Sequence, residues 1–559
     1  KNQQSPKGAP TFFVRAGGID QWADATIGNR EFKDFLSRCL INPSKSSKCP
    51  KHPLTRPNPR KNMCAPSTAP PNNSNIGTLE IIRSIVSLSL PLVLLQTLLL
   101  LPSTMTTYTL GNSSNPLPLL SAFSLSNMTL NVTSVMVVVG SMTALDTLLP
   151  VKFKSDPGAM PQLCSTTLLH TTLLLVPLLF TWFAPKPCSV TSVLALLSVP
   201  DDIILLILPF LRRYALAVPP LVLHQVSNKF LLAQSQTKPQ IAAALTSTTL
   251  HYALLQFLDP GSLLPSSCVK TVAFIFVAST WCNFLALVAY CYVFRPFAHT
   301  TFTFPPPPPS LLSSQARQQF GLSIFGILAL SEWLYWEYQT FLLSSTHSET
   351  AMASQAVVYA LIPLLYMVPL GWAIGTCVLV GNALGEGKIE RARKVMNVAF
   401  LSGFANAALI GCAIRVAKAG IIDAFTGDEE VKSALDRIWS GVALFVFTDQ
   451  VFGVQGGLLR SLGLQGRLSL LIVLSLYLVG VPLSYWSVSD AGLNGLWRVM
   501  AIPYLVLNLG MVGAWKNANL AEVGERLKGG GGGGEYEKVV MEEDDGDGEE
   551  VEMSGRINI

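Results

Sequence analysis

Long apolar blocks alternate with short polar segments from residue 79 to residue 515. Each block reaches about 20 residues, the length at which a helix crosses a bilayer core of about 30 Å. Gly, Pro, Ser and charged residues gather between the blocks, as expected for the loops that join such helices. The pattern predicts twelve membrane helices, near residues 79–102, 118–148, 162–184, 201–235, 239–258, 268–294, 317–343, 351–383, 393–417, 432–462, 466–487 and 492–515.

The composition of the 559-residue chain agrees with this pattern. Hydrophobic residues make up 50% of it, charged residues only 13%, and the mean hydropathy is +0.43. An ordinary soluble protein is about 25% charged. We therefore predict an all-α, polytopic membrane protein. The ten cysteines form no CxxC pair, which argues against a metal or redox site.

A run of prolines divides the twelve helices into two sets of six. Pro305–Pro309 falls between the sixth and seventh helices. We therefore predict a first lobe at 79–300, a Pro-rich loop at 301–316 and a second lobe at 317–516.

A weak internal repeat supports this division. Val139–Asp146 aligns with Leu370–Cys377 at an offset of 231 residues, and Leu231–Pro239 aligns with Leu458–Gly466 at an offset of 227. Internal repeats of this kind are common in secondary transporters, whose sites lie between or within the repeats. Each lobe is thus interpreted as one copy of a six-helix unit.

The two ends of the chain carry opposite charge. Residues 1–78 hold twelve Lys and Arg against four acids and are predicted to be a disordered basic arm near anionic lipid, not a nucleic-acid binder. Residues 517–559 are predicted to be a disordered tail, with a Gly linker at 529–534 and ten acids at 535–552. Whether residues 1–62, which precede the first methionine, belong to the mature protein stays open.

Lys and Arg are unevenly shared between the loops. If both termini lie on one side of the membrane, the connections on that side hold eleven Lys and Arg, against five on the other side. Positive charge marks cytoplasmic loops. We expect both termini in the cytoplasm, and the protein in the plasma membrane or the vacuolar membrane.

Two acids lie inside predicted membrane helices. Glu332 is near the middle of the seventh helix and Asp449 is in the tenth. A carboxylate at such a depth costs about 2.5–3.5 kcal/mol on insertion scales, so each is a candidate functional residue. Removal from water disfavours the charged form of a carboxyl, which lets protons compete with a cation for it.

Aromatic and polar residues accompany the first of these acids. Glu332, Trp336 and Gln339 share one helix face by their i, i+4, i+7 spacing. Glu337 lies about 140° round the helix, nearer its outer end. Carboxylates beside indole rings suit an organic cation, through ion pairing and cation–π attraction. The alternative is that the acids only hold neighbouring helices together.

The eighth helix carries a more specific pattern. It contains two GxxxG spacings, Gly371/Gly375 and Gly381/Gly385, which permit close helix packing, and Asn382 follows Gly381. As a string, YMVPLGWAIGTCVLVGNALGEGKIERARK resembles the multidrug and toxic compound extrusion (MATE) transporters of eukaryotic type. Other segments match the family in order: Leu120–Asp146, Phe230–Pro239, Glu332–Glu337, Asp449–Gly463 and Gly492–Trp497. The resemblance covers residues 79–516.

The resemblance implies two six-helix lobes around a central cleft, and cation-coupled efflux. It places the family's second-lobe acids at Glu332 and Asp449, with Glu337 as a secondary position and Gln355 and Tyr359 on the cleft wall. The chain also departs from the family. The first lobe's Cys-Gly-Gln-Ala-Phe-Gly run is replaced by Leu149–Lys154, Ala360 stands where close animal relatives carry Glu, and Leu379 replaces a frequent Arg.

These observations lead to one interpretation and several alternatives. We expect a monomeric proton-coupled antiporter that exports organic cations, xenobiotics or secondary metabolites, without a cofactor. Sodium coupling, export of organic anions such as citrate, and a divergent non-transporting scaffold remain alternatives. We expect no enzyme, because His170, His224 and His251 form no catalytic or metal-binding constellation.

Overall fold

The computed structural model describes residues 77–529, apart from 112, 114–115, 197–200, 296–312, 345, 347 and 427. All of them belong to one unit of the chain, Asn73–Ile559. The predicted basic arm up to residue 76, most of the Pro-rich loop and the acidic tail from residue 530 lie outside the described residues.

The first lobe is built from helices alone in its described part. Apolar segments in a bilayer must satisfy their backbone groups internally, which a helix does. The elements are α3 (Thr78–Gly111), α4 (Pro116–Leu130), the π-helical turn η1 (Asn131–Val135), α5 (Met136–Ser155), the 3₁₀ turn η2 (Pro157–Ala159), α6 (Met160–Phe180), α7 (Val190–Leu196), α8 (Asp201–Tyr214), η3 (Ala215–Ala217), α9 (Val218–Ala233), α10 (Lys238–Leu258), η4 (Pro260–Ser262) and α11 (Pro265–Phe294).

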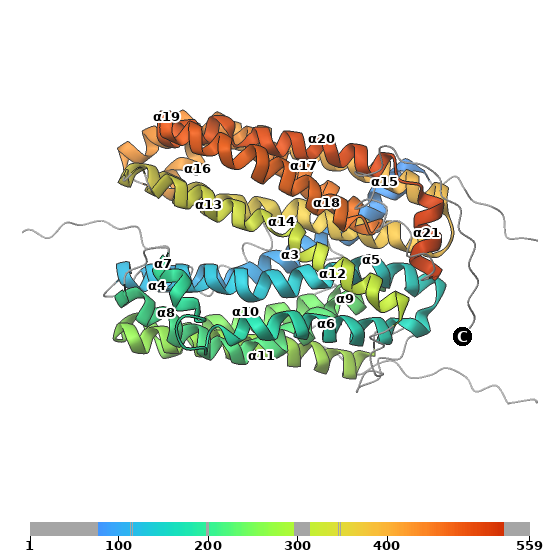
Figure 1. Cartoon of the computed structure of the whole chain (residues 1–559), viewed down its shortest axis with the longest axis horizontal. Helices are drawn as coiled ribbons and strands as arrows, with labels where there is room; N and C mark the ends of the chain where they lie inside the picture. The colour runs from blue at the N-terminus through green and yellow to red at the C-terminus, as the bar shows by residue number, and fades with distance from the viewer. Residues whose placement is uncertain are drawn as a thin grey trace, which may run out of the picture. The chain divides into compact units, whose positions relative to one another are not determined.

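The described part of the second lobe is also built from helices, and it packs beside the first lobe (Figure 1). Its elements are α12 (Ser314–Ala329), α13 (Glu332–Ser344), α14 (Glu349–Gly385), α15 (Ile389–Val416), α16 (Lys418–Phe425), α17 (Glu429–Ser461), α18 (Gln465–Ile472), the π-helical stretch η5 (Val473–Gly480), α19 (Val481–Val499), α20 (Ala501–Lys516) and α21 (Leu520–Gly529).

The prediction of an all-α polytopic membrane protein is confirmed. Ten helical segments of the described chain are long and apolar enough to cross a bilayer. Two features account for the difference from the twelve predicted helices. The predicted seventh helix is broken into α12 and α13. The last segment, Gln465–Lys516, is 52 residues long because it joins two predicted helices across a sharp bend at Ala491 and Gly492.

Glycines bring the two lobes into close contact. A Cβ at Gly371 would lie 2.6 Å from the Val93 side chain of α3, and one at Gly385 would lie 2.3 Å from the Val151 carbonyl oxygen of α5. Gly375 and Gly381 meet α3 and α5 in the same way. The glycine pattern of the eighth helix is thus where α14 packs on the first lobe.

Polar side chains join the lobes at the end of the molecule that holds α21. Thr147 Oγ1 of α5 donates to the Arg460 carbonyl oxygen of α17 at 2.6 Å, and Gln465 Nε2 donates to Thr147 Oγ1 at 2.7 Å. The Lys154 ammonium of α5 lies 3.6 Å from the Glu386 carboxylate after α14. These contacts fasten the lobes to each other at the α21 end.

Helix α21 was not predicted, because residues 517–559 read as linker and tail. It packs against α5 of the first lobe and against α14 and α15 of the second. Its apolar side chains Leu520, Val523 and Leu527 are buried. Lys152 Nζ donates to the Lys528 carbonyl oxygen at 2.5 Å. The i, i+3, i+7 spacing of the three apolar residues is the signal that marks this short amphipathic helix.

Candidate functional site

The break between α12 and α13 places Glu332 at a helix start. Leu330 and Ser331 separate the two helices, and Glu332 lies in the first turn of α13. The Ser331 carbonyl oxygen accepts the Leu334 N–H of α13 at 3.0 Å and also the Tyr477 hydroxyl at 2.6 Å. The backbone N–H groups at a helix start favour negative charge. The chain thus partly compensates the burial of this carboxylate by ending one helix and beginning another beside it.

A tyrosine from another helix holds the Glu332 carboxylate. Tyr504 Oη of α20 donates to Glu332 Oε1 at 2.7 Å, and Trp336 Nε1 donates to Tyr504 Oη at 3.1 Å. The Glu332 side chain is only 6% exposed. Trp336 therefore acts on the carboxylate through Tyr504, while its ring packs edge-on against Phe445 and Tyr359.

Asp449 lies near Glu332 within the second lobe. It belongs to α17 and is 3% exposed. The Tyr504 ring, whose hydroxyl holds Glu332, packs against Phe445 and Phe452, which lie one turn before and one turn after Asp449. Helix α17 also packs closely on α14, because Gly457 leaves only enough room for the backbone of Ala373. The structure thus brings together the two acids that the sequence singled out.

Buried amide side chains join α20, which carries Tyr504, to α17, which carries Asp449. Asn508 of α20, one turn after Tyr504, donates through Nδ2 to the Thr448 carbonyl oxygen at 2.9 Å. Gln455 Nε2 donates to Asn508 Oδ1 at 2.8 Å. Neither Tyr504 nor Asn508 was predicted from the sequence as a site residue. Asn508 is the only side-chain amide in α20, which is the signal that could have found it.

Three of the remaining predicted residues take part in two further hydrogen bonds. Tyr359 Oη donates to Glu337 Oε1 at 2.9 Å, and Trp497 Nε1 donates to Gln355 Oε1 at 3.1 Å. Gln339 is fully buried, and neither end of its amide has a hydrogen-bond partner among the described residues. An unpaired buried amide favours a bound water or a polar ligand at this point.

A partly buried ion pair, which was not predicted from the sequence, lies in the first lobe. Lys229 of α9 and Asp146 of α5 lie 2.8 Å apart. Cys377 Sγ of α14 donates to the Asp146 carbonyl oxygen at 3.3 Å. Asp146 and Cys377 are equivalent positions of the internal repeat. Contact between equivalent positions is the arrangement expected where a pseudo-twofold axis passes between two related lobes.

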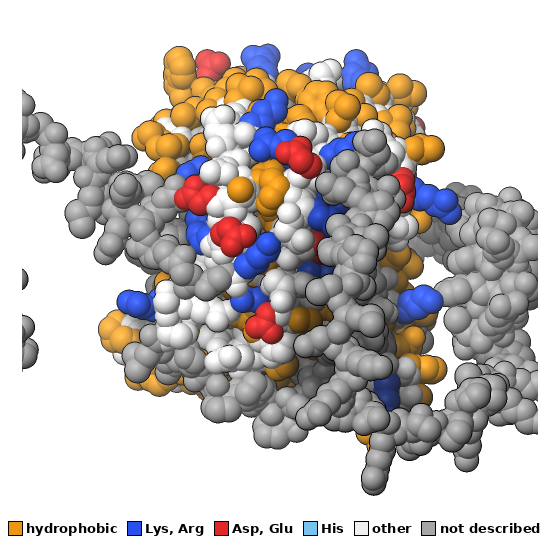
Figure 2. Space-filling view, turned by 90° about the vertical axis from the view of Figure 1, so that its right-hand side faces the viewer, with side chains coloured by type: hydrophobic (Ala, Val, Ile, Leu, Met, Phe, Trp, Pro, Cys, Tyr) orange, Lys and Arg blue, Asp and Glu red, His pale blue; other side chains and the backbone are white. Residues whose placement is uncertain are grey.

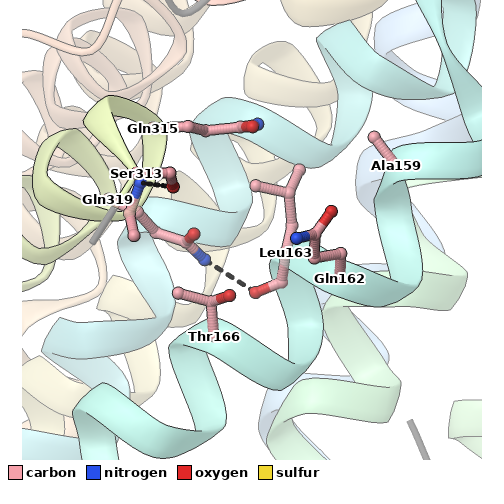
Figure 3. A pocket seen from close by; sticks show the side chains of 8 residues that line it. Ala159, Gln162, Leu163, Thr166, Ser313, Gln315 and Gln319 are labelled. Carbon is pink, nitrogen blue, oxygen red and sulfur yellow. Dashed lines mark hydrogen bonds between the residues drawn. The ribbon is translucent and has the colours of Figure 1, made fainter. Parts of the chain in front are cut away.

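One pocket of the described chain lies between α6 and α12, away from the acids (Figure 3). Its wall includes Gln162 and Thr166 of α6 and Gln319 of α12. Gln319 Nε2 donates to the Leu163 carbonyl oxygen at 2.6 Å, and Ser313 Oγ accepts from the Ala316 N–H at 3.1 Å. These polar groups already bond to each other and tie α12 to the first lobe. No group of three His, Cys, Asp or Glu side chains in the described part could hold a metal ion.

The chain resembles several curated transporters. It is 28% identical to multidrug and toxin extrusion protein 1 of Danio rerio over 52% of this chain and 48% of that protein, so the match spans about half of that relative. It is 28% identical to multidrug and toxin extrusion protein 2 of Mus musculus over 68% of this chain and 65% of that protein. It is 27% identical to multidrug and toxin extrusion protein 1 of Oryctolagus cuniculus over 78% of this chain and 75% of that protein.

Solved structures have the same fold. The eukaryotic MATE transporter AtDTX14 superposes with a TM-score of 0.70 at 17% identity, over 81% of this chain and 99% of that one. A mutant of the Vibrio cholerae MATE transporter VcmN superposes with a TM-score of 0.67 at 15% identity, over 80% and 99%.

The family comparison covers both lobes. The MatE model matches residues 91–257 and 323–486, more than half of the chain and one block in each lobe. The chain therefore belongs to the MatE family, a family of membrane transporters and not of enzymes.

Proposed function

We propose that the chain is a proton-coupled antiporter that exports organic cations, among them xenobiotics or secondary metabolites. The observation that carries this proposal is the pair of buried carboxyls, Glu332 and Asp449, which lie around Tyr504 and the rings that pack on it. Two close buried carboxyls resist simultaneous ionisation. Protons or one bound cation relieve this repulsion, which makes their binding mutually exclusive.

The exchange cycle follows from this competition. When the site is open to the outside, the acids take up protons and release the cation. When it is open to the inside, they lose the protons and bind a new cation. Each pH unit across the membrane supplies about 1.4 kcal/mol per proton. A potential of 100 mV adds about 2.3 kcal/mol per charge moved. One proton per cation is thus enough for a tenfold gradient.

The aromatic surroundings favour a flat or bulky cation. Trp336, Phe445, Tyr359 and Tyr504 belong to one connected group of rings next to Glu332. Their faces attract positive charge. The names of the curated relatives describe extrusion of drugs and toxins, in agreement with such a ligand.

Transport into proteoliposomes tests the proposal. With an imposed pH gradient, the wild-type chain should accumulate the fluorescent cation ethidium. Glu332→Gln and Asp449→Asn should each reduce proton-driven uptake at least tenfold, because neither amide can exchange a proton. A tenfold lower rate corresponds to a barrier that is higher by about 1.4 kcal/mol. Asp202→Asn, at an exposed acid of α8, is the control and should keep the wild-type rate. Uptake by Glu332→Gln at that rate would rule out its role as a proton site.

The same vesicles separate the alternatives. Uptake driven by a sodium gradient without a pH gradient would favour sodium coupling. Accumulation of citrate in place of ethidium would favour an anion exporter. No movement of any of these solutes, in a correctly folded preparation, would favour the scaffold.

We also propose that the α21 end faces the cytoplasm and that the protein works as a monomer in the plasma or vacuolar membrane. Figure 2 views this end, where Lys and Arg side chains gather around the helix ends. Cationic loops are retained on the cytoplasmic side. A cysteine placed at exposed Glu525 should react with a membrane-impermeant reagent only after the cells are opened; labelling of intact cells would contradict this orientation.

A further inference from the structure

A second pocket lies at the α21 end, remote in sequence from the acid pair. It forms where the start of α15, the end of α20 and the start of α21 meet, and it encloses about 560 Å³ including the part open to solvent. Its polar lining consists of Arg393 and Asn397 from α15 and Lys516 from α20. Trp515 and Leu520 complete the wall.

The two cations of this pocket have no carboxylate partner among the described residues, in contrast to their neighbours. Lys154, Lys388 and Arg391 share the Glu386 carboxylate at 2.9–3.6 Å. No acidic side chain of the described chain forms an ion pair with Arg393 or Lys516. Two positive charges therefore line one pocket without an ion-pair partner among residues 77–529 as far as the structure describes them.

The tryptophan of the pocket wall is held in place by its neighbours. Trp515 is 4% exposed, and its Nε1 donates to Gln455 Oε1 at 3.2 Å. Its ring lies 5.4 Å from the ring of Phe400, and the Lys516 ammonium lies 5.8 Å from the Trp515 ring. These contacts fix the indole between α15 and α20. A ligand would meet a preformed wall, which lowers the entropy lost on binding.

Exposed apolar residues continue from the pocket toward the middle of the membrane. On α20, Leu505 and Leu509 are more than half exposed, and a Cβ at Gly513 would meet nothing within 4 Å. Leu509 and Lys516 are seven residues apart and so share a helix face. On α15, Leu401 is 70% exposed and lies one turn beyond Asn397. A ligand that fits both parts carries an anionic group and long apolar chains.

We propose that this pocket binds the phosphate headgroup of an anionic phospholipid. Arg393 and Lys516 would neutralise the phosphate, Asn397 would donate a hydrogen bond, and the acyl chains would lie along the exposed faces of α15 and α20. Basic pockets between helices at the cytoplasmic surface are suited to such headgroups. Because Leu520 begins α21, the bound headgroup would also touch the helix that spans both lobes.

Native mass spectrometry of the purified full chain tests the site. The delipidated protein is titrated with phosphatidylinositol and with phosphatidylcholine of the same acyl chains, and bound lipids are counted. We expect preferential binding of phosphatidylinositol, weakened about fivefold by Arg393→Gln or Lys516→Gln and about 30-fold by the double variant. The charge-preserving pair Arg393→Lys and Lys516→Arg should keep the preference. Arg415→Gln, at the other end of α15, is the control and should also keep it.

Three outcomes would overturn the proposal. The double variant could bind phosphatidylinositol as the wild type does, or Arg415→Gln could weaken binding equally, which would show a general charge effect. Displacement of the lipid by millimolar inorganic phosphate would assign the pocket to a soluble anion. Size-exclusion profiles and thermal unfolding of each variant confirm that the chains compared are folded.

Discussion

At the scale of single residues, one hydroxyl organises the proposed proton site. Tyr504 bonds to Glu332, receives the indole N–H of Trp336 and packs at 4.9 Å from the Phe445 ring. Hydrogen bonds to an ionised group contribute about 1.5–3 kcal/mol. Tyr504 therefore stabilises the ionised form of Glu332, which is the form proposed to bind a cation.

Removal of this hydroxyl should change the pH dependence of transport. Tyr504→Phe leaves the ring but withdraws the donor, so Glu332 should keep its proton at a higher pH. We expect the pH of half-maximal cation binding to move to more alkaline values in a binding titration. Tyr485→Phe, at an exposed position of α19, should leave the titration unchanged. A Tyr504→Phe curve that coincides with the wild type would contradict this role.

The Glu386 carboxylate contributes to stability at the α21 end. Burial tends to raise the pKa of Glu386, but the hydrogen bond from Lys388 and the charges of Lys388, Lys154 and Arg391 outweigh it and lower the pKa below its ordinary value of 4.5. A carboxyl whose pKa is lower in the folded than in the unfolded state stabilises the fold at pH values above its unfolded-state pKa. This stabilisation is lost as the pH falls through the folded-state pKa.

The unfolding temperature should report this contribution. The Tm difference between wild type and Glu386→Gln should be constant above about pH 5.5 and should shrink below about pH 4.5, where the wild-type carboxylate becomes protonated. Glu525→Gln, on the exposed side of α21, is the comparison variant. A difference that grows on acidification would contradict the sign of this linkage.

At the scale of elements, the apolar blocks were sufficient to predict where the membrane helices lie. The break at Leu330 and Ser331 could not be predicted, because the local sequence contains neither Pro nor Gly there. Tyr477, which lies far along the chain, donates its hydroxyl to the Ser331 carbonyl oxygen at this break. The prediction of Glu332 and Asp449 as a pair depended on the family resemblance, since spacing alone does not reveal which helices meet. Tyr504 and Asn508 were not predicted, because they lie within an apolar span.

Two adjacent glycines of α17 test the packing that brings Asp449 to α14. A Cβ at Gly457 would lie 2.6 Å from the backbone of Ala373, whereas a Cβ at Gly456 would meet nothing within 4 Å. Gly457→Ala should destabilise the protein by about 1–3 kcal/mol, as overpacking does. Gly456→Ala should be neutral or slightly stabilising, as expected for a helical glycine. Equal unfolding temperatures for the two variants would contradict this packing.

At the scale of the whole molecule, the described chain is fastened at one end. The contacts of Thr147 with Arg460, of Lys154 with Glu386 and of Lys152 with α21 all join the lobes there. An antiporter must open alternately to the two sides, and transporters of this kind do so by moving one lobe against the other. If the chain works as the proposed antiporter, these contacts are expected to break during each transport cycle.

A reversible cross-link tests this requirement. In a background without native cysteines, Lys154→Cys and Glu386→Cys are joined by a reducible thiol cross-linker. Cross-linking should stop ethidium uptake, and reduction should restore it, because the lobes are then free to separate. Each single cysteine variant treated in the same way should remain active. Undiminished uptake by the cross-linked protein would show that the lobes do not part at this end.

The central claim is that protons and the transported cation compete for Glu332 and Asp449. Proton release measures this directly, by adding ethidium to the purified protein in a weakly buffered solution with a pH indicator. The wild type should release protons as the cation binds, and Glu332→Gln should release fewer. Cation binding by the wild type without any proton release would contradict the account.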